Sequence, residues 1–386
     1  MKNNTPIYLV SIVYSDLPSD TRVIREAAEA SRQGLQVTIV APQPSAKKIP
    51  NVSNKIQINY LPAPQERGRT TLSGQLRFIS ELNKWIKHTQ RPDIIHIHNM
   101  PDYLYWPFRK WQNNGTRVVL DIHDIMSEVA LHRYNGIKSY LISSLLQLAE
   151  KVVWPRVDHI ITVHDDYAKK INKSGIKREL ISVIPNVPDD LVCSVKHRLT
   201  PKLNGFKIVF HGTITKRSGI FHAVKAFSTV KAIIPAATMV IIGDGEDAGL
   251  LKDIIDKSNA CNSISFYNTF LPFSDVLNYI ADADVAVVPY EVSKYTLSVL
   301  PVKLIEYCTL GIPVVATRLP MIEKYFGEDS ILYVDTPEPS SIATELVRIH
   351  DTDKLRDKLA QNGQSIAINI GWPRFKMTLM HALTGR

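Results

Sequence analysis

The chain has 386 residues, of which 45% are hydrophobic, so it is long enough for two domains that each bury a core. This composition excludes a disordered protein, and no apolar run reaches the roughly 18 residues that a membrane span needs. The sequence has three widely spaced cysteines: Cys193, Cys261 and Cys308. Their spacing argues against a disulfide framework or a zinc site, and it fits a reducing cytoplasm.

The net charge of +9 is unevenly distributed along the chain. Residues 1–190 hold 25 Lys+Arg and 18 Asp+Glu, whereas residues 191–386 hold 21 and 19. A basic N-terminal half fits an anionic partner, such as the inner face of a membrane or a lipid pyrophosphate, and it equally fits an ordinary solvated surface. We expect no nucleic-acid partner, because no run of basic residues carries interleaved aromatic side chains.

Short runs rich in Val and Ile alternate with amphipathic stretches along the N-terminal half. The apolar runs predict strands at residues 7–13, 36–40, 56–61, 93–97, 116–121, 159–163 and 181–184. Helical periodicity predicts helices at residues 19–33, 71–88 and 139–153, and we expect the last to be a buried helix rather than a membrane anchor. Strands that are apolar on both faces are typical of a parallel sheet covered by helices.

The alternation pauses at residues 189–205, where prolines and polar residues predict a linker. It then resumes with predicted strands at residues 206–210, 239–242, 263–267, 285–288, 313–316 and 331–334. We therefore predict an α/β protein with two Rossmann-like, doubly wound domains, at residues 1–188 and 206–371. Such sheets bind ligands at the carboxyl ends of their strands, here in a cleft that the two domains face.

The segment from Pro301 to Thr317 is the most informative part of the sequence. Pro301 suits the first turn of a helix, so Lys303 lies in that turn, where a cation opposes the helix dipole. An anion bound at the helix N-terminus would explain this lysine. Glu306 follows one turn later on the same face and suits sugar hydroxyls. Lys303 on a diphosphate and Glu306 on a ribose would bind a nucleotide, although an ordinary surface Lys–Glu pair has the same spacing.

Several motifs in this order resemble retaining glycosyltransferase family 4, which has the GT-B fold. The donor-binding segment of that family is similar to Pro301-x-Lys303-x-x-Glu306-Tyr307 followed by Gly311-x-Pro313. The other matching motifs are Asp20-Thr21-Arg22-Val23-Ile24-Arg25-Glu26-Ala27, Asp121-Ile122-His123-Asp124, Ile184-Pro185-Asn186-Val187, Phe210-His211-Gly212-Thr213 and Ile242-Gly243-Asp244-Gly245-Glu246. The resemblance covers almost the whole chain. It implies that residues 372–386 form a helix that crosses back to the first domain.

The resemblance implies a transferase that moves a sugar from a UDP- or GDP-sugar donor. The acceptor would be a saccharide or a lipid-linked sugar in polysaccharide or glycolipid biosynthesis, and transfer would retain the anomeric configuration. The implied donor-binding residues are Gly212, Thr213, Arg217, Gly243, Gly245, Glu246, Tyr290, Lys303 and Glu306. No cofactor or metal is expected, because Arg217 and Lys303 would stabilise the leaving diphosphate.

His123 follows a predicted strand and should lie at the carboxyl end of that strand, where the resemblance places the reacting sugar. Asp124 would orient His123 or the acceptor. The predicted acceptor-binding residues are Asp20, Arg22, His98, Asn99 and Asp102. An N-cap role is the simpler alternative for Asp20. His96 and His98 share one face of a strand, but no third ligand follows at a spacing that suits a metal.

Two alternatives stay open at this stage. Ser298 stands eight residues before Glu306, where many family members carry a first glutamate that contacts the donor sugar. Its absence favours a non-catalytic homologue that binds sugar nucleotides. The other alternative is a GT-B nucleotide-sugar 2-epimerase, which would need acid/base carboxylates and no acceptor. A dehydrogenase is disfavoured, because Gly249 comes one residue too late for the dinucleotide motif that Gly243 and Gly245 begin.

Overall fold

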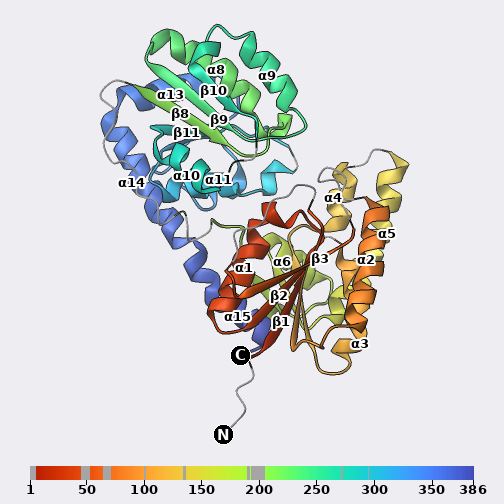
Figure 1. Cartoon of the computed structure of the whole chain (residues 1–386). Helices are drawn as coiled ribbons and strands as arrows, with labels where there is room; N and C mark the ends of the chain where they lie inside the picture. The colour runs from red at the N-terminus through yellow and green to blue at the C-terminus, as the bar shows by residue number, and fades with distance from the viewer. Residues whose placement is uncertain are drawn as a thin grey trace. The chain divides into compact units, whose positions relative to one another are not determined.

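A computed structural model of the chain describes residues 6–44, 53–63, 71–99, 101–133, 136–188, 192, 205–269, 271, 273–293 and 295–386. The chain forms two compact units, which Figure 1 shows. Unit 1 consists of residues 1–186 and 375–386, and unit 2 of residues 187–374. The predicted linker at residues 189–205 lies outside the described residues, apart from Val192 and Gly205.

Unit 1 contains a seven-stranded sheet in the order β3-β2-β1-β4-β5-β6-β7, and every pairing in it is parallel. Its strands are β1 (Tyr8–Ile12), β2 (Gln36–Pro42), β3 (Ile56–Leu61), β4 (Ile94–His98), β5 (Arg117–Ile122), β6 (His159–Thr162) and β7 (Ile181–Val183). The strand order reverses between β1 and β4. Such a switch point is where open parallel sheets bind ligands, beyond the carboxyl ends of the strands.

The helices of unit 1 connect these strands. They are α1 (Thr21–Arg32), α2 (Leu72–Lys87), α3 (Arg109–Gln112), α4 (Met126–Arg133), α5 (Ile137–Val153) and α6 (Asp165–Lys173), with 3-10 helices η1 (Leu17–Ser19), η2 (Asp102–Phe108), η3 (Trp154–Arg156) and η4 (Arg178–Leu180). The Asp20 side chain accepts a hydrogen bond from the N–H of Val23 at 3.3 Å. Asp20 is therefore the N-cap of α1, as the simpler alternative predicted.

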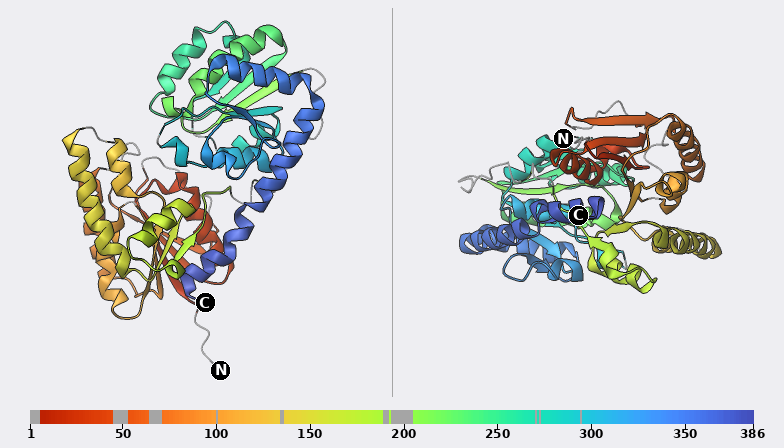
Figure 2. Two further views of the ribbon diagram at one scale, coloured as in Figure 1. Left: turned by 180° about the vertical axis from the view of Figure 1, so that it is seen from behind. Right: turned by 90° about the horizontal axis from the view of Figure 1, so that it is seen from below.

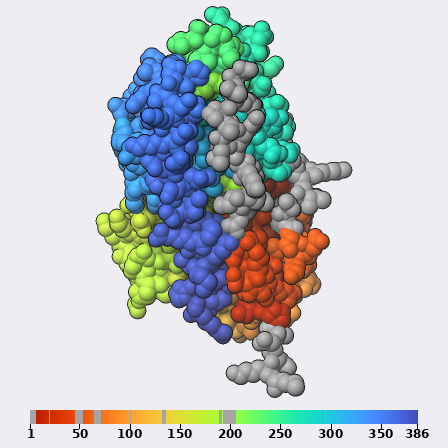
Figure 3. All heavy atoms as spheres, turned by 90° about the vertical axis from the view of Figure 1, so that its left-hand side faces the viewer, coloured from red at the N-terminus to blue at the C-terminus, as the bar shows by residue number. Residues whose placement is uncertain are grey.

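The C-terminal helix α15 (Lys376–Thr384) belongs to unit 1. Nε and Nη2 of Arg117, on β5, donate to the carbonyl oxygen of Ala382 at 3.2 and 3.1 Å. Helix α15 also contacts α1, and Figure 3 shows the dark blue C-terminal segment beside the red to orange surface of the N-terminal part of the chain. The predicted return of the C-terminal helix to the first domain is confirmed.

The exposed face of α5 corrects the prediction that this helix is buried. Helix α5 lies beside α4, as the views in Figures 1 and 2 show, and it also contacts η2. Its buried side is formed largely by Ser139, Ser143, Glu150 and Val153. Five large apolar side chains on the other face are 60% to 80% exposed: Ile137, Tyr140, Leu141, Leu145 and Leu148. The prediction was wrong because it assigned the apolar side of α5 to the interior, whereas the structure buries the side that carries Ser139, Ser143 and Glu150. None of the described helices is long and apolar enough to span a membrane.

Unit 2 contains a six-stranded parallel sheet in the order β10-β9-β8-β11-β12-β13. Its strands are β8 (Phe206–His211), β9 (Ala237–Ile242), β10 (Ile264–Tyr267), β11 (Val285–Val288), β12 (Val314–Thr317) and β13 (Leu332–Val334). Its α-helices are α8 (Ile220–Ile233), α9 (Ala248–Asp256), α10 (Phe273–Ala281), α11 (Val302–Thr309), α12 (Pro320–Glu323), α13 (Pro339–Asp351) and α14 (Asp353–Asn369), and its 3-10 helices are η5 (Lys216–Ser218), η6 (Cys261–Ser263), η7 (Thr296–Ser298) and η8 (Trp372–Phe375).

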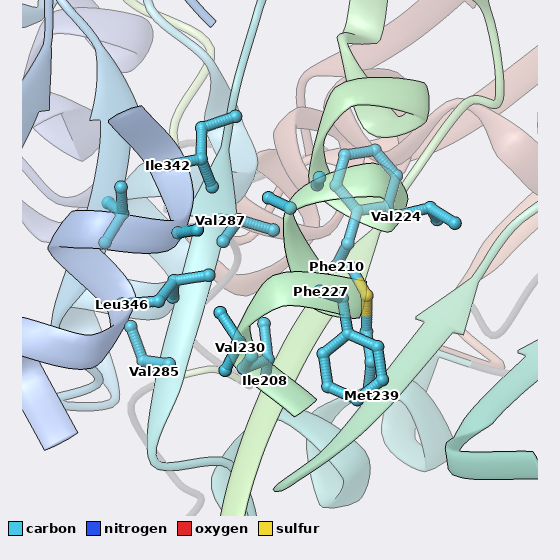
Figure 4. Close-up of a cluster of buried hydrophobic side chains, with 14 of the residues drawn as sticks. Ile208, Phe210, Val224, Phe227, Val230, Met239, Val285, Val287, Ile342 and Leu346 are labelled. Atoms are coloured by element: carbon cyan, nitrogen blue, oxygen red, sulfur yellow. The ribbon is translucent and has the colours of Figure 1, made fainter. Parts of the chain in front are cut away.

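The core of unit 2 lies between this sheet and helices α8 and α13, as Figure 4 shows. Phe210 and Phe227 are fully buried there beside Met239. Burial of each such side chain contributes about 1.5–3 kcal/mol. This packing holds the carboxyl ends of β8 and β11, the neighbouring strands at which the order of the second sheet reverses.

Candidate active site

The loops after β8, β9 and β11 approach one another so closely that they require glycine. Gly219 adopts a left-handed conformation with φ +68°, and a Cβ there would overlap the carbonyl oxygen of Pro289. A Cβ on Gly243, at φ +150°, would overlap the carbonyl oxygen of Gly212. A Cβ on Gly245 would overlap the carbonyl oxygen of Ile214. Because backbone carbonyls fill the space of a Cβ at all three positions, these glycines allow the loops to pack directly against one another at the carboxyl end of the sheet.

Lys303 lies in the first turn of α11 and is only 9% exposed. Its Nζ is 4.0 Å from the ring centroid of Phe210 and 5.6 Å from that of Tyr290. A Cβ on Gly212 would lie 2.6 Å from the same nitrogen. Burial lowers the pKa of Lys303 to about 7, although the nearby Glu306 carboxylate opposes the shift. Among the described residues, Lys303 forms no ion pair within 4.0 Å.

Glu306 lies on the same face of α11 and is almost buried. Its Oε2 lies 2.7 Å from Nε2 of His211, the last residue of β8. Nδ1 of His211 in turn lies 2.8 Å from the phenol oxygen of Tyr307. His211 and Tyr307 were not among the predicted site residues, although both stand inside motifs that resemble the family.

The remaining predicted donor residues lie on the loops at the carboxyl end of this sheet. Tyr290 follows β11, and burial raises the pKa of its phenol to about 12. Arg217, on η5, is exposed, and its guanidinium carbon lies 4.5 Å from the ring centroid of Tyr295. Thr213 and Glu246 are exposed on the loops after β8 and β9. The structure therefore brings Gly212, Tyr290, Lys303 and Glu306 together, with Arg217 at the surface.

In unit 1, Asp121 at the end of β5 is the centre of a buried polar network, although it was not among the predicted site residues. Arg22 on α1 donates from Nε and Nη2 to both carboxylate oxygens of Asp121, at 2.7 and 2.8 Å. Its Nη1 donates to the carbonyl oxygen of Ile184 and to Oδ1 of Asn186. Arg22 thus joins three segments of unit 1, and its contact with an anionic acceptor stays a prediction.

His123 also belongs to this network, and 20% of its side chain is exposed. Its Nε2 lies 3.2 Å from Oδ2 of Asp121 and 3.4 Å from Nδ1 of His98. Burial alone would lower the pKa of His123, but the Asp121 carboxylate outweighs burial and raises it above its ordinary value. The backbone N–H of His123 donates to Oδ1 of Asn99 at 2.9 Å. His123 therefore presents a charge-stabilised imidazole at the carboxyl end of β5.

The other predicted acceptor residues are buried beneath the loop that carries His123. Asn99 donates from Nδ2 to Oδ1 of Asp102 at 3.0 Å and to the carbonyl oxygen of Asp124 at 2.8 Å. Nε1 of Trp154 donates to the other oxygen of Asp102. His98 is fully buried, with Nε2 3.0 Å from Oγ of Ser11. These residues position the loop in the structure, while their contact with an acceptor stays a prediction.

Four buried residues of unit 1 have the chemistry of metal ligands: Glu26, His96, His98 and Asp121, with one ligand atom each within 4.8 Å of the others. The guanidinium of Arg22 already contacts both carboxylates, with Nε 3.2 Å from Glu26 and 2.7 Å from Asp121. Burial raises the pKa of Glu26 to about 8 and lowers that of His96 well below its ordinary value. A buried cation and largely neutral partners make this a protein charge network rather than a ready metal site.

Comparisons with solved structures show the class of fold. A sucrose-phosphate synthase from Thermosynechococcus elongatus superposes with a TM-score of 0.74 and 15% identity, over 97% of this chain and 98% of that one. HepE from Anabaena, solved with UDP and glucose, gives a TM-score of 0.71 and 15% identity, over 98% and 100%. WaaG, a glycosyltransferase involved in lipopolysaccharide biosynthesis, gives 0.69 and 14%, over 98% and 100%. These similarities define the GT-B fold.

Family models and curated relatives then identify the family. Residues 20–187 match the glycosyl transferase 4-like domain, and residues 195–366 match glycosyl transferases group 1. An uncharacterized glycosyltransferase of Methanocaldococcus jannaschii is 27% identical over 220 residues, which are 52% of this chain and 51% of that protein. A chitobiosyldiphosphodolichol beta-mannosyltransferase of Candida albicans is 22% identical over 258 residues, 61% of this chain and 55% of that protein. The match spans only about half of each relative, but the two family models cover both units, and the chain belongs to the GT-B glycosyltransferases.

Proposed function

We propose that the protein transfers a sugar from a UDP- or GDP-sugar to a saccharide or lipid-linked acceptor, with retention of configuration, in polysaccharide or glycolipid biosynthesis. The observation that carries this proposal is the buried ammonium of Lys303, beside glycine loops and Glu306. A buried charge without a counter-ion is costly, and a diphosphate supplies the counter-charge. The complex of HepE with UDP and glucose supports a nucleotide as a ligand of this fold.

Each residue then has a distinct task in this proposal. Lys303 and Arg217 stabilise the charge that develops on the diphosphate as its bond to the anomeric carbon breaks, without a metal. Glu306 accepts hydrogen bonds from the ribose hydroxyls. His123, held by Asp121, would donate a hydrogen bond to the transferred sugar. The acceptor oxygen bonds to the anomeric carbon, and its proton passes to the leaving diphosphate.

A thermal-shift screen tests the donor site. Wild type, Lys303→Ala and the exposed control Lys252→Ala are each measured with UDP, GDP, ADP and TDP and with their sugars. We expect one carrier to raise the melting temperature of wild type and of Lys252→Ala, because a ligand that binds only the folded state stabilises it. Lys303→Ala should lose this shift. Folded wild-type protein that responds to none of these nucleotides would overturn the proposal.

Product analysis then separates transfer from the two alternatives. The selected sugar nucleotide is incubated alone and with simple saccharide or lipid-linked acceptors. A new glycosidic product that forms only with an acceptor supports transfer. An epimerised sugar nucleotide formed without an acceptor would favour the 2-epimerase, and binding without turnover would favour the non-catalytic homologue.

We further propose that unit 1 contacts the inner face of an anionic membrane through the exposed face of α5. This face carries the five exposed apolar side chains described above. Its exposed charged residues are Lys138 and Lys151, both basic, because Glu150 is turned inward and accepts from Ser127 at 2.9 and 2.8 Å. An apolar stripe whose exposed charges on α5 itself are basic suits the interface of an anionic bilayer, where it would reach a lipid-linked acceptor.

Vesicle sedimentation tests this contact. Wild type should sediment with vesicles of phosphatidylcholine and phosphatidylglycerol more than with phosphatidylcholine alone. The double variant Leu141→Ser/Leu145→Ser should stay in the supernatant, whereas the control Ile233→Ser/Leu250→Ser, which changes exposed apolar residues of unit 2, should still sediment. If wild type sediments with neither kind of vesicle, the face does not bind membranes. The same conclusion would follow if wild type is a dimer that the α5 substitutions dissociate and the control substitutions do not.

A further inference from the structure

A chain of three polar side chains links the end of β8 to α11. The phenol oxygen of Tyr307 accepts from the backbone N–H of His211 at 2.8 Å and lies 2.8 Å from its Nδ1. Nε2 of the same imidazole lies 2.7 Å from Oε2 of Glu306. The two rings are almost perpendicular, at 88°, with centroids 5.0 Å apart. This arrangement fixes the imidazole at both nitrogens.

The direction of proton donation along this chain follows from burial. Tyr307 is fully buried, and burial raises the pKa of its phenol well above the ordinary value, so it keeps its proton. Its oxygen already accepts one hydrogen bond, which leaves its single O–H to donate to Nδ1 of His211. A neutral imidazole that accepts at Nδ1 carries its proton on Nε2. His211 therefore donates to Oε2 of Glu306.

We propose that His211 and Tyr307 are positioning residues that set the preference of the donor site for ribose over deoxyribose, by holding Glu306 as a fixed acceptor. The proposal rests on the proposed function, in which Glu306 binds the ribose. His211 donates a hydrogen bond to Oε2 of Glu306, and among the described residues no hydrogen bond involves the other oxygen, Oε1. A carboxylate ordered before the ligand arrives loses little further freedom on binding, so its hydrogen bonds to the ribose hydroxyls count fully toward affinity.

The first measurement is the ratio of dissociation constants for each ribonucleoside diphosphate and its 2′-deoxy analogue, with UDP, GDP and ADP as probes. Hydrogen bonds to a charged acceptor are strong, so we expect wild type to prefer the ribonucleotide by about tenfold or more. Glu306→Ala should bring the ratio close to one. A wild type that binds both forms equally would overturn the ribose role of Glu306 and the positioning role with it.

Two substitutions at His211 distinguish positioning from packing. His211→Gln keeps an Nε2–H close to the original position and should retain much of the preference for ribose. His211→Phe keeps a planar ring but has no donor, and it should lose most of the preference. If His211 served only to fill space, the aromatic replacement would be tolerated better and the order of the two variants would be reversed.

Tyr307→Phe tests the beginning of the chain, because it removes the O–H that fixes the imidazole tautomer. We expect the ribose preference to fall severalfold while the affinity for the deoxynucleotide changes little. Tyr333→Phe is the matched control, since it also removes a phenol hydroxyl of unit 2, one that donates to the carbonyl oxygen of Phe326. If Tyr307→Phe and both His211 variants fold, bind nucleotide and keep the wild-type ratio, the positioning proposal is wrong while the donor site stands. If wild type binds no nucleotide, the proposed function fails first.

Discussion

Arg22 and Asp121 form a bidentate pair, with N–O distances of 2.7 and 2.8 Å, although 99 residues separate them in the sequence. Both side chains are at most 4% exposed. An arginine in the first turn of α1 is unfavourable because its positive charge opposes the helix dipole. The hydrogen-bonded Asp121 carboxylate offsets this cost, which explains why Arg22 stands there. It also ties α1 to the carboxyl end of β5, which carries His123.

Replacement of Arg22 by Met should strongly destabilise unit 1. The change leaves the Asp121 carboxylate buried without its main counter-charge, which costs about 3–5 kcal/mol. Urea unfolding followed by tryptophan fluorescence reports largely on unit 1, because Trp85, Trp106, Trp111 and Trp154 all lie there. The control Arg77→Met, on the exposed side of α2, should change stability by less than about 0.5 kcal/mol. Equal unfolding midpoints for the two variants would contradict a structural role for the pair.

Asp121→Asn should lower the pKa of His123. In wild type the carboxylate raises this pKa against the effect of burial, and the amide removes that attraction. The raised pKa of His123 stabilises the folded state at low pH, and this contribution is lost as pH rises through the folded pKa. The contribution of Asp121 to stability has the opposite pH dependence. Burial alone would raise the pKa of Asp121, but Arg22 outweighs burial and holds this pKa well below the ordinary value, so the contribution is lost in acid.

An NMR titration of the imidazole resonances measures this change, with the histidines of unit 2 as internal references. The His123 resonance should titrate at lower pH in Asp121→Asn than in wild type, while the references stay unchanged. An unchanged or higher pKa would show that Asp121 does not control the charge of His123.

The strands of both sheets were predictable because each is a continuous apolar run that parallel packing buries on both faces. Lys303 and Glu306 were visible as a pair, since one helical turn separates them. Arg22–Asp121 and His211–Glu306 were not, because each pair joins segments 99 and 95 residues apart that meet only in the folded sheet. The exposed face of α5 was missed for a different reason: periodicity predicts that the apolar side of a helix faces the core, whereas α5 buries Ser139, Ser143 and Glu150 and exposes its large apolar side chains.

Gly219→Ala should destabilise unit 2, whereas Gly249→Ala should not. A Cβ at Gly219 overlaps the backbone of Pro289 and strains a left-handed residue, so we expect a loss of roughly 2 kcal/mol or more. Gly249 lies inside α9 with nothing within 4 Å of an added Cβ, and alanine there should stabilise the helix by about 0.5–1 kcal/mol. Hydrogen exchange of the amides in β8 and α8 measures both effects. Equal protection in the two variants would contradict the close approach of the β8 and β11 loops.

Lys303→Met should stabilise the free protein while weakening nucleotide binding. The folded pKa of Lys303 is about 7, against an ordinary value of 10.5, so between these two values the unfolded chain binds more protons than the folded chain. The stability of wild type should therefore rise with pH across this window, because burial of the charged form is unfavourable below it. Methionine fills similar space without the charge, and we expect a gain of about 2–4 kcal/mol at pH 7 and a flatter dependence on pH. Urea unfolding of unit 2 between pH 7 and pH 10, followed by hydrogen exchange, measures both quantities.

Nucleotide binding should favour the charged form of Lys303, which burial disfavours in the free protein. A diphosphate beside Nζ raises the pKa of Lys303, so wild type should take up close to one proton per nucleotide at pH 8, and its affinity should fall as pH rises above 7. Calorimetry in buffers of different ionisation enthalpy counts these protons. Lys303→Met should bind more weakly and without proton uptake, whereas Lys252→Ala should behave as wild type. Binding by wild type without proton uptake would mean that the ammonium is already charged in the free protein, and the stability gain of Lys303→Met should then disappear as well.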